Sequence, residues 1–331
     1  MNFTANIREF PAKVKEKIKE LPQKIKDLPK RIFSGERKKR SKLDTGGFTP
    51  LTVVLFVLLI LYVISLLTPL IWAFITSFKA QRDFRINIIG LPKQWVWNFE
   101  TVFKQFTVRV NTAEGTVKVG MAQMFLYSVL YAVGCAFFNT LVPCTTAYCC
   151  ARFKYRFSNL IYAIVIITMT LPIVGSLPAE IRMAKAIGLY DHIWGLWLMK
   201  ANFLGMYFLV FYSAFKGLPA GFREAAKIDG AGNGRIFLNV EFPVIKGAFF
   251  TVMLINFIGF WNDYQTPLIY LPSYPTVALG MYHMANTTEN SLSTVPMRMA
   301  GAMLLLIPIL IIFLIFHKRL MNNLTMGGLK G

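Results

Sequence analysis

Four long stretches of this 331-residue chain contain no Asp, Glu, Lys or Arg. A helix needs about 20 apolar residues to cross the hydrocarbon core of a bilayer, and each of these stretches can supply one. Only 16% of the residues are charged, whereas a soluble domain carries about a quarter. The chain is therefore expected to cross a membrane several times as helices. The uncharged stretches are 45–78, 119–151, 157–179 and 299–316.

The net charge of +20 would suggest a nucleic-acid partner if the protein were soluble. Fourteen of the 36 Lys and Arg residues lie before Thr45, however, on a terminus that is too charged to enter lipid. An excess of Lys and Arg marks the cytoplasmic side of membrane proteins. We therefore place the N-terminus in the cytoplasm and expect no nucleic-acid partner.

Six membrane spans are expected, with both termini in the cytoplasm. The loop after the second span is basic (Arg152, Lys154 and Arg156), as is the segment after the sixth, so both are placed inside. Lys200 interrupts the fourth span, where it either reaches the outer headgroups or faces a wet cavity or a partner subunit. The expected spans are 51–78, 121–149, 159–178, 190–215, 245–269 and 299–316.

The N-terminal arm, residues 1–48, has a pattern of its own. Its apolar residues recur in steps of three and four, which is one face of a helix, but Pro22 and Pro29 break that helix into short pieces. Such a basic segment can lie on the anionic inner leaflet or remain solvated and disordered. No cleavable signal peptide is expected, because the first apolar run begins near residue 48 and is too long. The four cysteines (Cys135, Cys144, Cys149 and Cys150) are expected to be membrane-buried thiols outside any disulfide.

A polar segment between the fourth and fifth spans, residues 217–243, has the composition of two short helices. Residues 222–228 are helix formers throughout, Gly230 is expected to end the first helix, and a second can begin near Asn233 or Gly234. Pro243 then starts the fifth span. We call the segment 217–243 the bracket. A short, stiff segment tied to the membrane at both ends would let a soluble protein push on the spans that it joins.

Motifs in this segment resemble those of a known family. At the family's spacing, the chain contains Glu224-Ala225-Ala226, Asp229-Gly230-Ala231 and Phe242-Pro243. The chain thereby resembles the permease subunits of carbohydrate importers of the ATP-binding-cassette (ABC) class, the maltose-permease type. The likeness covers about residues 50–331 and includes Trp261-Asn262-Asp263-Tyr264 and the glycine-rich tail 324–331. The chain departs from the pattern at Phe242, where Leu is usual, with Glu241 before it, and at Gly247, where a second proline is common.

The resemblance implies an all-α bundle of six transmembrane helices over 49–331, the type I permease fold, with a coupling loop at 217–243 and a tail at 317–331. In that fold the loop docks into a cleft of a cytoplasmic ATPase. Glu224 would pair with a basic residue there, Ala225 and Ala226 would allow close approach, and Gly230 would permit the tight turn. The coupling residues so implied are Glu224, Ala225, Ala226, Asp229, Gly230 and Pro243.

The implied partners are a second, homologous permease, two ATPase subunits that bind MgATP, and an extracytoplasmic solute-binding protein that delivers a carbohydrate, expected to be an oligosaccharide. Docking of the binding protein is assigned to the outer loop 270–298, and contact with the ATPase to the tail. The residues assigned to the outer loop are Tyr270, Pro272, Tyr274 and Pro275, and those assigned to the tail are Gly327, Gly328 and Lys330.

The transport path has one candidate set in the fifth span, Trp261, Asn262, Asp263 and Tyr264. Aromatic faces beside polar groups suit sugar rings, and an ionisable residue inside a membrane is a functional candidate by default. The same residues can equally form an aromatic belt at the outer interface. In the family the sugar contacts can also lie wholly on the partner permease.

No phosphate-binding loop of the form Gly-x-x-x-x-Gly-Lys-Ser/Thr occurs in the sequence, so we expect ATP hydrolysis on a separate chain. The three histidines are scattered and predict no metal site, and we expect no enzymatic activity and no cofactor on this chain. The alternatives are a secondary carrier driven by an ion gradient, a membrane-embedded enzyme, and an ABC permease for a non-sugar solute.

Overall fold

In the computed structural model of the chain, residues 50–112, 115–153, 155–171, 175–286, 292 and 294–326 are described. The basic arm 1–48 and the tail residues Gly327, Gly328 and Lys330 lie outside these ranges, so the expectations for both stay predictions. Contacts divide the chain into two compact units, Met1–Leu66 and Leu67–Gly331, with the boundary inside helix α4 (Pro50–Thr76).

The described part of the first unit, residues 50–66, is a helix with every residue exposed. Its side chains are almost all Leu, Val, Ile, Phe or Tyr. A helix that is apolar on all sides is stable only when lipid or other helices surround it. Helix α4 thus has the length and surface expected of the first membrane span.

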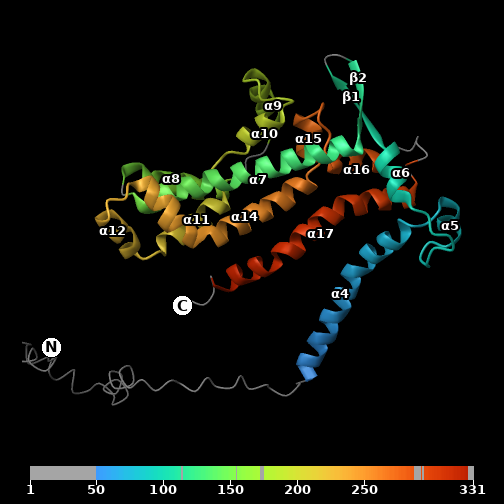
Figure 1. Cartoon of the computed structure of the whole chain (residues 1–331), viewed down its shortest axis with the longest axis horizontal. Helices are drawn as coiled ribbons and strands as arrows, with labels where there is room; N and C mark the ends of the chain where they lie inside the picture. The colour runs from blue at the N-terminus through green and yellow to red at the C-terminus, as the bar shows by residue number, and fades with distance from the viewer. Residues whose placement is uncertain are drawn as a thin grey trace, which may run out of the picture. The chain divides into compact units, whose positions relative to one another are not determined.

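The second unit is mostly helical, and Figure 1 shows how its elements follow one another along the chain. Its elements are α5 (Gln81–Ile86), α6 (Asn98–Gln105), β1 (Thr107–Thr112), β2 (Gly115–Gly120), α7 (Met121–Arg152), α8 (Arg156–Thr170), α9 (Leu177–Ala186), α10 (Ile193–Met199), α11 (Met206–Lys216), α12 (Ala220–Ile228), α13 (Asn233–Ile236), the π-helical turn η1 (Phe237–Glu241), α14 (Phe242–Asn262), α15 (Gln265–Tyr270), α16 (Val277–Asn286) and α17 (Val295–Met326).

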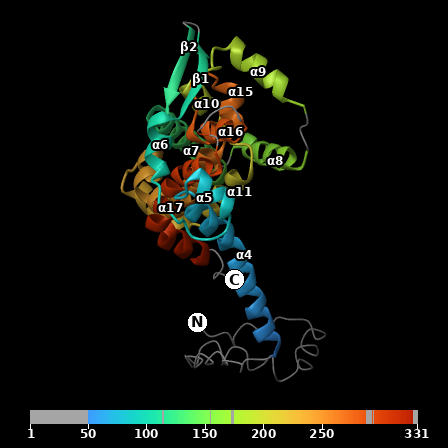
Figure 2. The same ribbon diagram turned by 90° about the vertical axis from the view of Figure 1, so that its right-hand side faces the viewer.

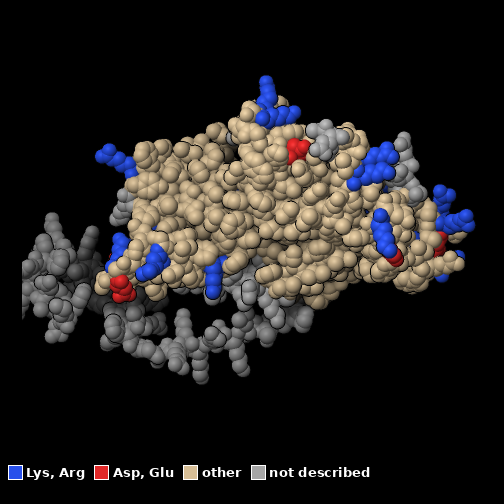
Figure 3. All heavy atoms as spheres, turned by 45° about the horizontal axis from the view of Figure 1, so that its top comes forward, with Lys and Arg blue, Asp and Glu red and all other residues tan. Residues whose placement is uncertain are grey.

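Helix α7 is the centre of this unit. It packs against α14, α11 and α10, while α17 lies along α14 (Figures 1 and 2). One buried apolar cluster joins α6, the hairpin and the first turns of α7 to α16 and α17, and another joins the last turns of α7 to α11 and α14. Charged side chains gather towards the two ends of the face in Figure 3, with a small group near its middle and a broad uncharged surface elsewhere. This distribution fits a body whose middle lies in a bilayer.

The described residues contain four helices that are long and apolar enough to cross a membrane: α4, α7, the continuous helix Asn233–Asn262, and α17 up to Phe316. Three of these lie on the first, second and sixth expected spans. The helix in the fifth ends at Asn262, short of the expected 269, and α15 follows as a separate helix. Helix α8, in the third, ends at Thr170, short of the expected 178. The six-span count therefore stays a prediction.

The expectation of one helix over 190–215 is corrected by the structure. Helix α10 ends at Met199 and α11 starts only at Met206. Between them the side-chain oxygen of Asn202 accepts the backbone N–H of Leu204 at 3.2 Å, and Gly205 has φ +140°, a conformation that favours glycine. A local hydrogen bond and one glycine thus take the place of the backbone hydrogen bonds of an α-helix in this segment.

A two-stranded antiparallel hairpin, absent from the all-α expectation, connects α6 to α7. Its register pairs Thr107 with Gly120 and Thr112 with Gly115. Val108 and Val110 are buried while Arg109 between them is exposed, which is the period-2 alternation of a half-buried strand. In Figures 1 and 2 the hairpin and α9 project on the same side of the unit.

Close packing of α10 on α7 depends on Gly134. A methyl group at this position would fall against the indole ring of Trp197, whose Nε1 donates to the Leu130 carbonyl at 3.0 Å.

We predict that Gly134→Ala lowers the free energy of unfolding by about 1–3 kcal/mol, because the indole of Trp197 must leave its site. Thermal unfolding of the purified chain in detergent measures this. The control is Gly259→Ala in α14, where a methyl group meets nothing within 4 Å; equal losses in the two variants would contradict the packing argument.

Candidate functional site

The segment between α11 and α14 forms a short exposed helix, α12, followed by a tight turn. Helix α12 ends with Asp229 as its C-cap, and Gly230 then adopts φ +77°. The backbone N–H of Ala231 reaches back to the Ala226 carbonyl at 2.9 Å, which closes the helix in the manner of a glycine C-terminal motif. The local expectations of a helix over 222–228 and of a stop at Gly230 are confirmed.

No residue of α12 is buried. Phe222 is 54% exposed and Ile228 is 87% exposed, while Glu224 and Ala225 lie on the surface beside them. The helix thus offers two large apolar side chains and one carboxylate to whatever covers it. Exposed apolar groups rimmed by polar ones are characteristic of surfaces that bind another protein.

The second half of the bracket is continuous with the membrane helix that follows it. Helix α13 starts at Asn233, as expected, and α13, η1 and α14 then run on without an intervening loop. Pro243 lies in the first turn of α14, directly after η1. In a first helical turn the missing N–H and the fixed φ of proline are tolerated. Helix α13 is therefore joined to α14 as one continuous helical segment.

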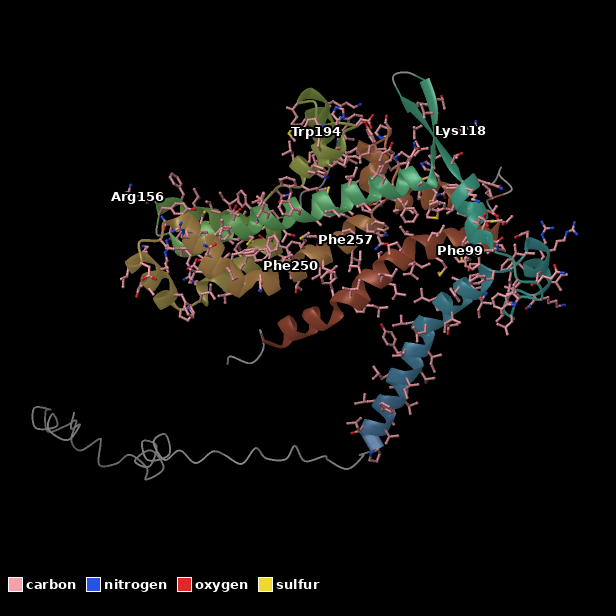
Figure 4. The ribbon with its side chains drawn as sticks, viewed as in Figure 1. Phe99, Lys118, Arg156, Trp194, Phe250 and Phe257 are labelled. Atoms are coloured by element: carbon pink, nitrogen blue, oxygen red, sulfur yellow. The ribbon has the colours of Figure 1, made fainter. Side chains whose placement is uncertain are left out.

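The ion pair between Arg152 and Glu241 was not predicted from the sequence. These residues meet at the base of the bracket, with Arg152 Nε 3.0 Å from Glu241 Oε1. The signal was present in the sequence as an acidic residue directly before Phe242-Pro243, at the edge of an apolar span. Figure 4 labels Arg156, four residues beyond Arg152, at the same end of the unit as α12; Phe99 and Lys118 lie at the opposite end.

The four residues proposed for the transport path do not converge on one surface. Trp261 is buried, donates to the Leu305 carbonyl at 3.0 Å and packs on Phe257, which Figure 4 labels. Asn262 is exposed, and its side chain donates to the Ile258 carbonyl at 2.9 Å. Tyr264 stacks on Tyr282 with ring centroids 4.6 Å apart.

Asp263 lies at the end of α14 as its C-cap and not inside a longer span. One of its oxygens accepts the Tyr131 hydroxyl at 2.9 Å, and the other accepts the Thr266 N–H at 3.0 Å. The carboxylate thus joins α7 to the start of α15. Its geometry gives it a structural function, and its assignment to the transport path stays a prediction.

A cavity of about 530 Å³ lies beside this junction, and Lys200 lines it. Five other polar residues also line the cavity. The ammonium of Lys200 lies 5.9 Å from the centre of the Phe260 ring. Of the two interpretations of Lys200, the geometry agrees with the one in which it faces a cavity. The other polar residues that line the cavity are Thr168, Glu180, Asn202, Thr266 and Tyr270.

Three of the four residues assigned to docking of a binding protein are partly or fully buried within this chain. Tyr270 is buried, and its hydroxyl donates to Glu180 at 3.3 Å; burial, and then the Glu180 carboxylate, raise the pKa of Tyr270. Tyr274 is half-buried against Tyr127, Pro275 is buried, and Pro272 alone of the four is exposed.

Asp191 fixes the backbone of this loop. It has φ +58° and accepts hydrogen bonds from the N–H and the hydroxyl of Ser273 at 3.0 and 2.7 Å. The docking assignment stays a prediction.

Among the described residues, no group of three His, Cys, Asp or Glu side chains could hold a metal ion. The geometry instead combines apolar spans, an exposed bracket at one end and a cavity with both polar and apolar residues in its lining. The class of protein so defined is a multi-pass helical membrane protein with an exposed helical bracket at one end.

Comparison with known proteins narrows this class. The model of the family "Binding-protein-dependent transport system inner membrane component" matches residues 139–325. The diacetylchitobiose uptake system permease NgcG of Streptomyces coelicolor is 27% identical over 278 residues, covering 82% of this chain and 87% of that protein. The melibiose/raffinose/stachyose import permease MelC of Bacillus subtilis is 25% identical over 261 residues, covering 77% and 88%.

Solved structures agree with the fold. A bacterial ABC transporter involved in the import of the acidic polysaccharide alginate contains a chain that superimposes with a TM-score of 0.67 at 22% identity, covering 81% of this chain and 95% of that one. The family match covers more than half of the 331 residues, so this chain belongs to the binding-protein-dependent transport system inner membrane components.

The two hydrogen bonds of Asp263 lead to a test of its function. We predict that Asp263→Ala lowers the free energy of unfolding by about 1–3 kcal/mol, because the Tyr131 hydroxyl then loses its acceptor. Asp263→Asn should lose less, since its side-chain oxygen can still accept the Thr266 N–H while its amide NH2 donates to the Tyr131 hydroxyl oxygen. Chemical denaturation of Asp263→Ala, Tyr131→Phe and the double variant measures the coupling between the two residues. Additive losses would contradict the structural assignment.

Proposed function

We propose that this chain is one permease subunit of an ATP-driven importer and that it transmits the motion of a separate ATPase through the bracket 217–243. The observation that carries the proposal is the exposed helix α12, closed at Gly230 and continued into α14 through α13 and η1. A rigid element with an uncovered apolar face, joined directly to a membrane helix, can convert a displacement outside the membrane into one inside it.

The proposed contact with the ATPase consists of Glu224, Ala225, Ala226 and Phe222. The carboxylate of Glu224 would pair with a basic residue of the ATPase, and the small alanines would let the two backbones approach. The chain itself would hold no nucleotide, since MgATP would bind to the two ATPase subunits. Both termini and the bracket would lie in the cytoplasm, with the hairpin and α9 outside, in agreement with the basic arm and with Arg152 and Arg156.

We propose a carbohydrate, and more narrowly an oligosaccharide, as the transported solute. Similar proteins are named for the uptake of diacetylchitobiose and of melibiose, raffinose and stachyose, which supports this choice. The cavity lined by Thr266, Asn202 and Tyr270 would offer hydroxyl, amide and aromatic groups, the side chains that bind sugar rings. A homologous second permease would complete the pore, and an extracytoplasmic binding protein would deliver the solute to the outer loops.

The bracket can be tested with Glu224→Ala combined with Gly230→Ala. The first change removes the carboxylate, and the second strains the turn at φ +77°. We predict that solute-stimulated ATP hydrolysis by the reconstituted complex falls by about tenfold or more, because transmission between sites 20–40 Å apart depends on a stiff connection.

The matched control is Glu100→Ala with Gly115→Ala, an exposed carboxylate and a glycine at φ +128°. This pair of changes should leave both assembly and stimulation intact. Unchanged stimulation in the bracket variant, with the ATPase still bound, would reject the proposed function.

A further inference from the structure

A buried ion pair lies where the bracket meets the end of α7. The Arg152 side chain is 10% exposed and that of Glu241 is 1% exposed, and their charged atoms approach to 3.0 Å. The contact does not have the geometry of a hydrogen bond, so charge attraction holds it. The second carboxylate oxygen, Oε2, is buried without a hydrogen-bond partner among the described residues.

The same arginine contacts the start of the bracket. Both terminal nitrogens of Arg152 reach the Leu218 carbonyl at 3.4 Å, at the long end of a hydrogen bond. Leu218 lies just before α12, whereas Glu241 is the last residue of η1, just after α13. One guanidinium therefore spans the two ends of the bracket, which are separated by more than twenty positions in the sequence.

A second arginine ties the middle of the bracket to the same place. Arg223, on α12, donates to the Arg152 carbonyl at 3.1 Å and to the side chain of Asn233 at 3.3 Å. Its guanidinium also lies 4.7 Å from the centre of the Phe153 ring. The end of α7 thus contacts the start of the bracket, α12 and η1, and through Arg223 it is linked to α13.

The π-helical turn is directly involved in this arrangement. A π-turn holds one more residue than an α-turn and so rotates the side chains that follow it around the helix axis. Glu241 closes this turn and is almost fully buried on the side of α7. A buried ion pair is seldom the most stable choice, since well-packed apolar residues can do as well. The pair therefore calls for an explanation other than stability.

We propose that Arg152 and Glu241 are positioning residues that transmit the displacement of α12 to α7, a helix to which the bracket is not covalently joined. This inference rests on the proposed function, because it presumes that an ATPase moves α12. The bracket is joined through the chain to α11 and α14, and the ion pair adds α7 as a third driven helix. Helices α7, α11 and α14 then move as one body.

The test uses the complete reconstituted complex and a variant that removes both charges, Arg152→Met with Glu241→Leu. Two apolar side chains can fill the site, so the unfolding midpoint should stay close to that of the parent. Solute-stimulated ATP hydrolysis should nevertheless fall by about fivefold or more, a coupling loss typical of separated sites. The KM for ATP should not change, since the nucleotide site is on another chain.

Single changes and a remote control separate positioning from folding. Glu241→Gln keeps the shape and removes the charge, and Arg152→Lys keeps the charge but not the fork that reaches Leu218; both should lose stimulation in part. If the double variant does not assemble, these two conservative variants decide the question. Lys104→Met with Glu100→Leu removes an exposed ion pair at the other end of the unit and should have no effect.

The two sets of variants distinguish failure of the ion-pair inference from failure of the proposed function. Loss of stimulation in Glu224→Ala/Gly230→Ala but full stimulation in stable, assembled Arg152 and Glu241 variants would overturn the inference and leave the bracket intact. Full stimulation in both sets would reject the bracket itself. Loss in both sets, with parent-like unfolding midpoints and an unchanged KM for ATP, supports the inference.

Discussion

Helix α7 is held against α14 by a buried chain of polar side chains, and most of the second unit is arranged around this contact. The amide of Asn139 donates to Asn256 at 3.0 Å, and Asn256 donates in turn to the hydroxyl of Thr140 at 3.0 Å. In a bilayer the hydrophobic effect does not bring helices together, because lipid is as apolar as leucine. Each such hydrogen bond contributes only about 0.6 kcal/mol, yet it selects one register of the two helices.

This register of α7 against α14 places polar contacts at both ends of α7. Near its N-terminal end, Ser128 accepts the backbone N–H of Val277 at 2.7 Å and Tyr131 donates to Asp263. At the other end, Arg152 meets Glu241 and the bracket. A rotation of α7 by one residue would move all of these partners to another face. Helix α7 therefore connects the contacts of Ser128 and Tyr131 to the bracket as one continuous helix about 48 Å long, at 1.5 Å rise for each of its 32 residues.

Local signals in the sequence were sufficient where one segment determines its own structure. The glycine at 230, the helix formers before it and the uncharged runs of α4, α7 and α17 all behave as their residue types predict. The sequence was insufficient where a polar side chain needs a distant partner. Nothing in the sequence shows, for example, that Tyr131 lies beside Asp263, 132 positions away. The hairpin 107–120 was missed for a different reason: its alternation extends over only a few residues in a long loop.

By itself the sequence determined that this chain is a multi-pass membrane protein and that a helical bracket with a glycine turn precedes one of its membrane helices, α14. These features depend on the length of apolar runs and on backbone preferences, which are local. Only the tertiary structure decided which residues the bracket contacts, that the fourth apolar segment is broken at Asn202–Gly205, and that Lys200 faces a cavity. Those outcomes depend on which helix faces satisfy one another's polar groups where water is excluded, and that is a property of the packed assembly of helices.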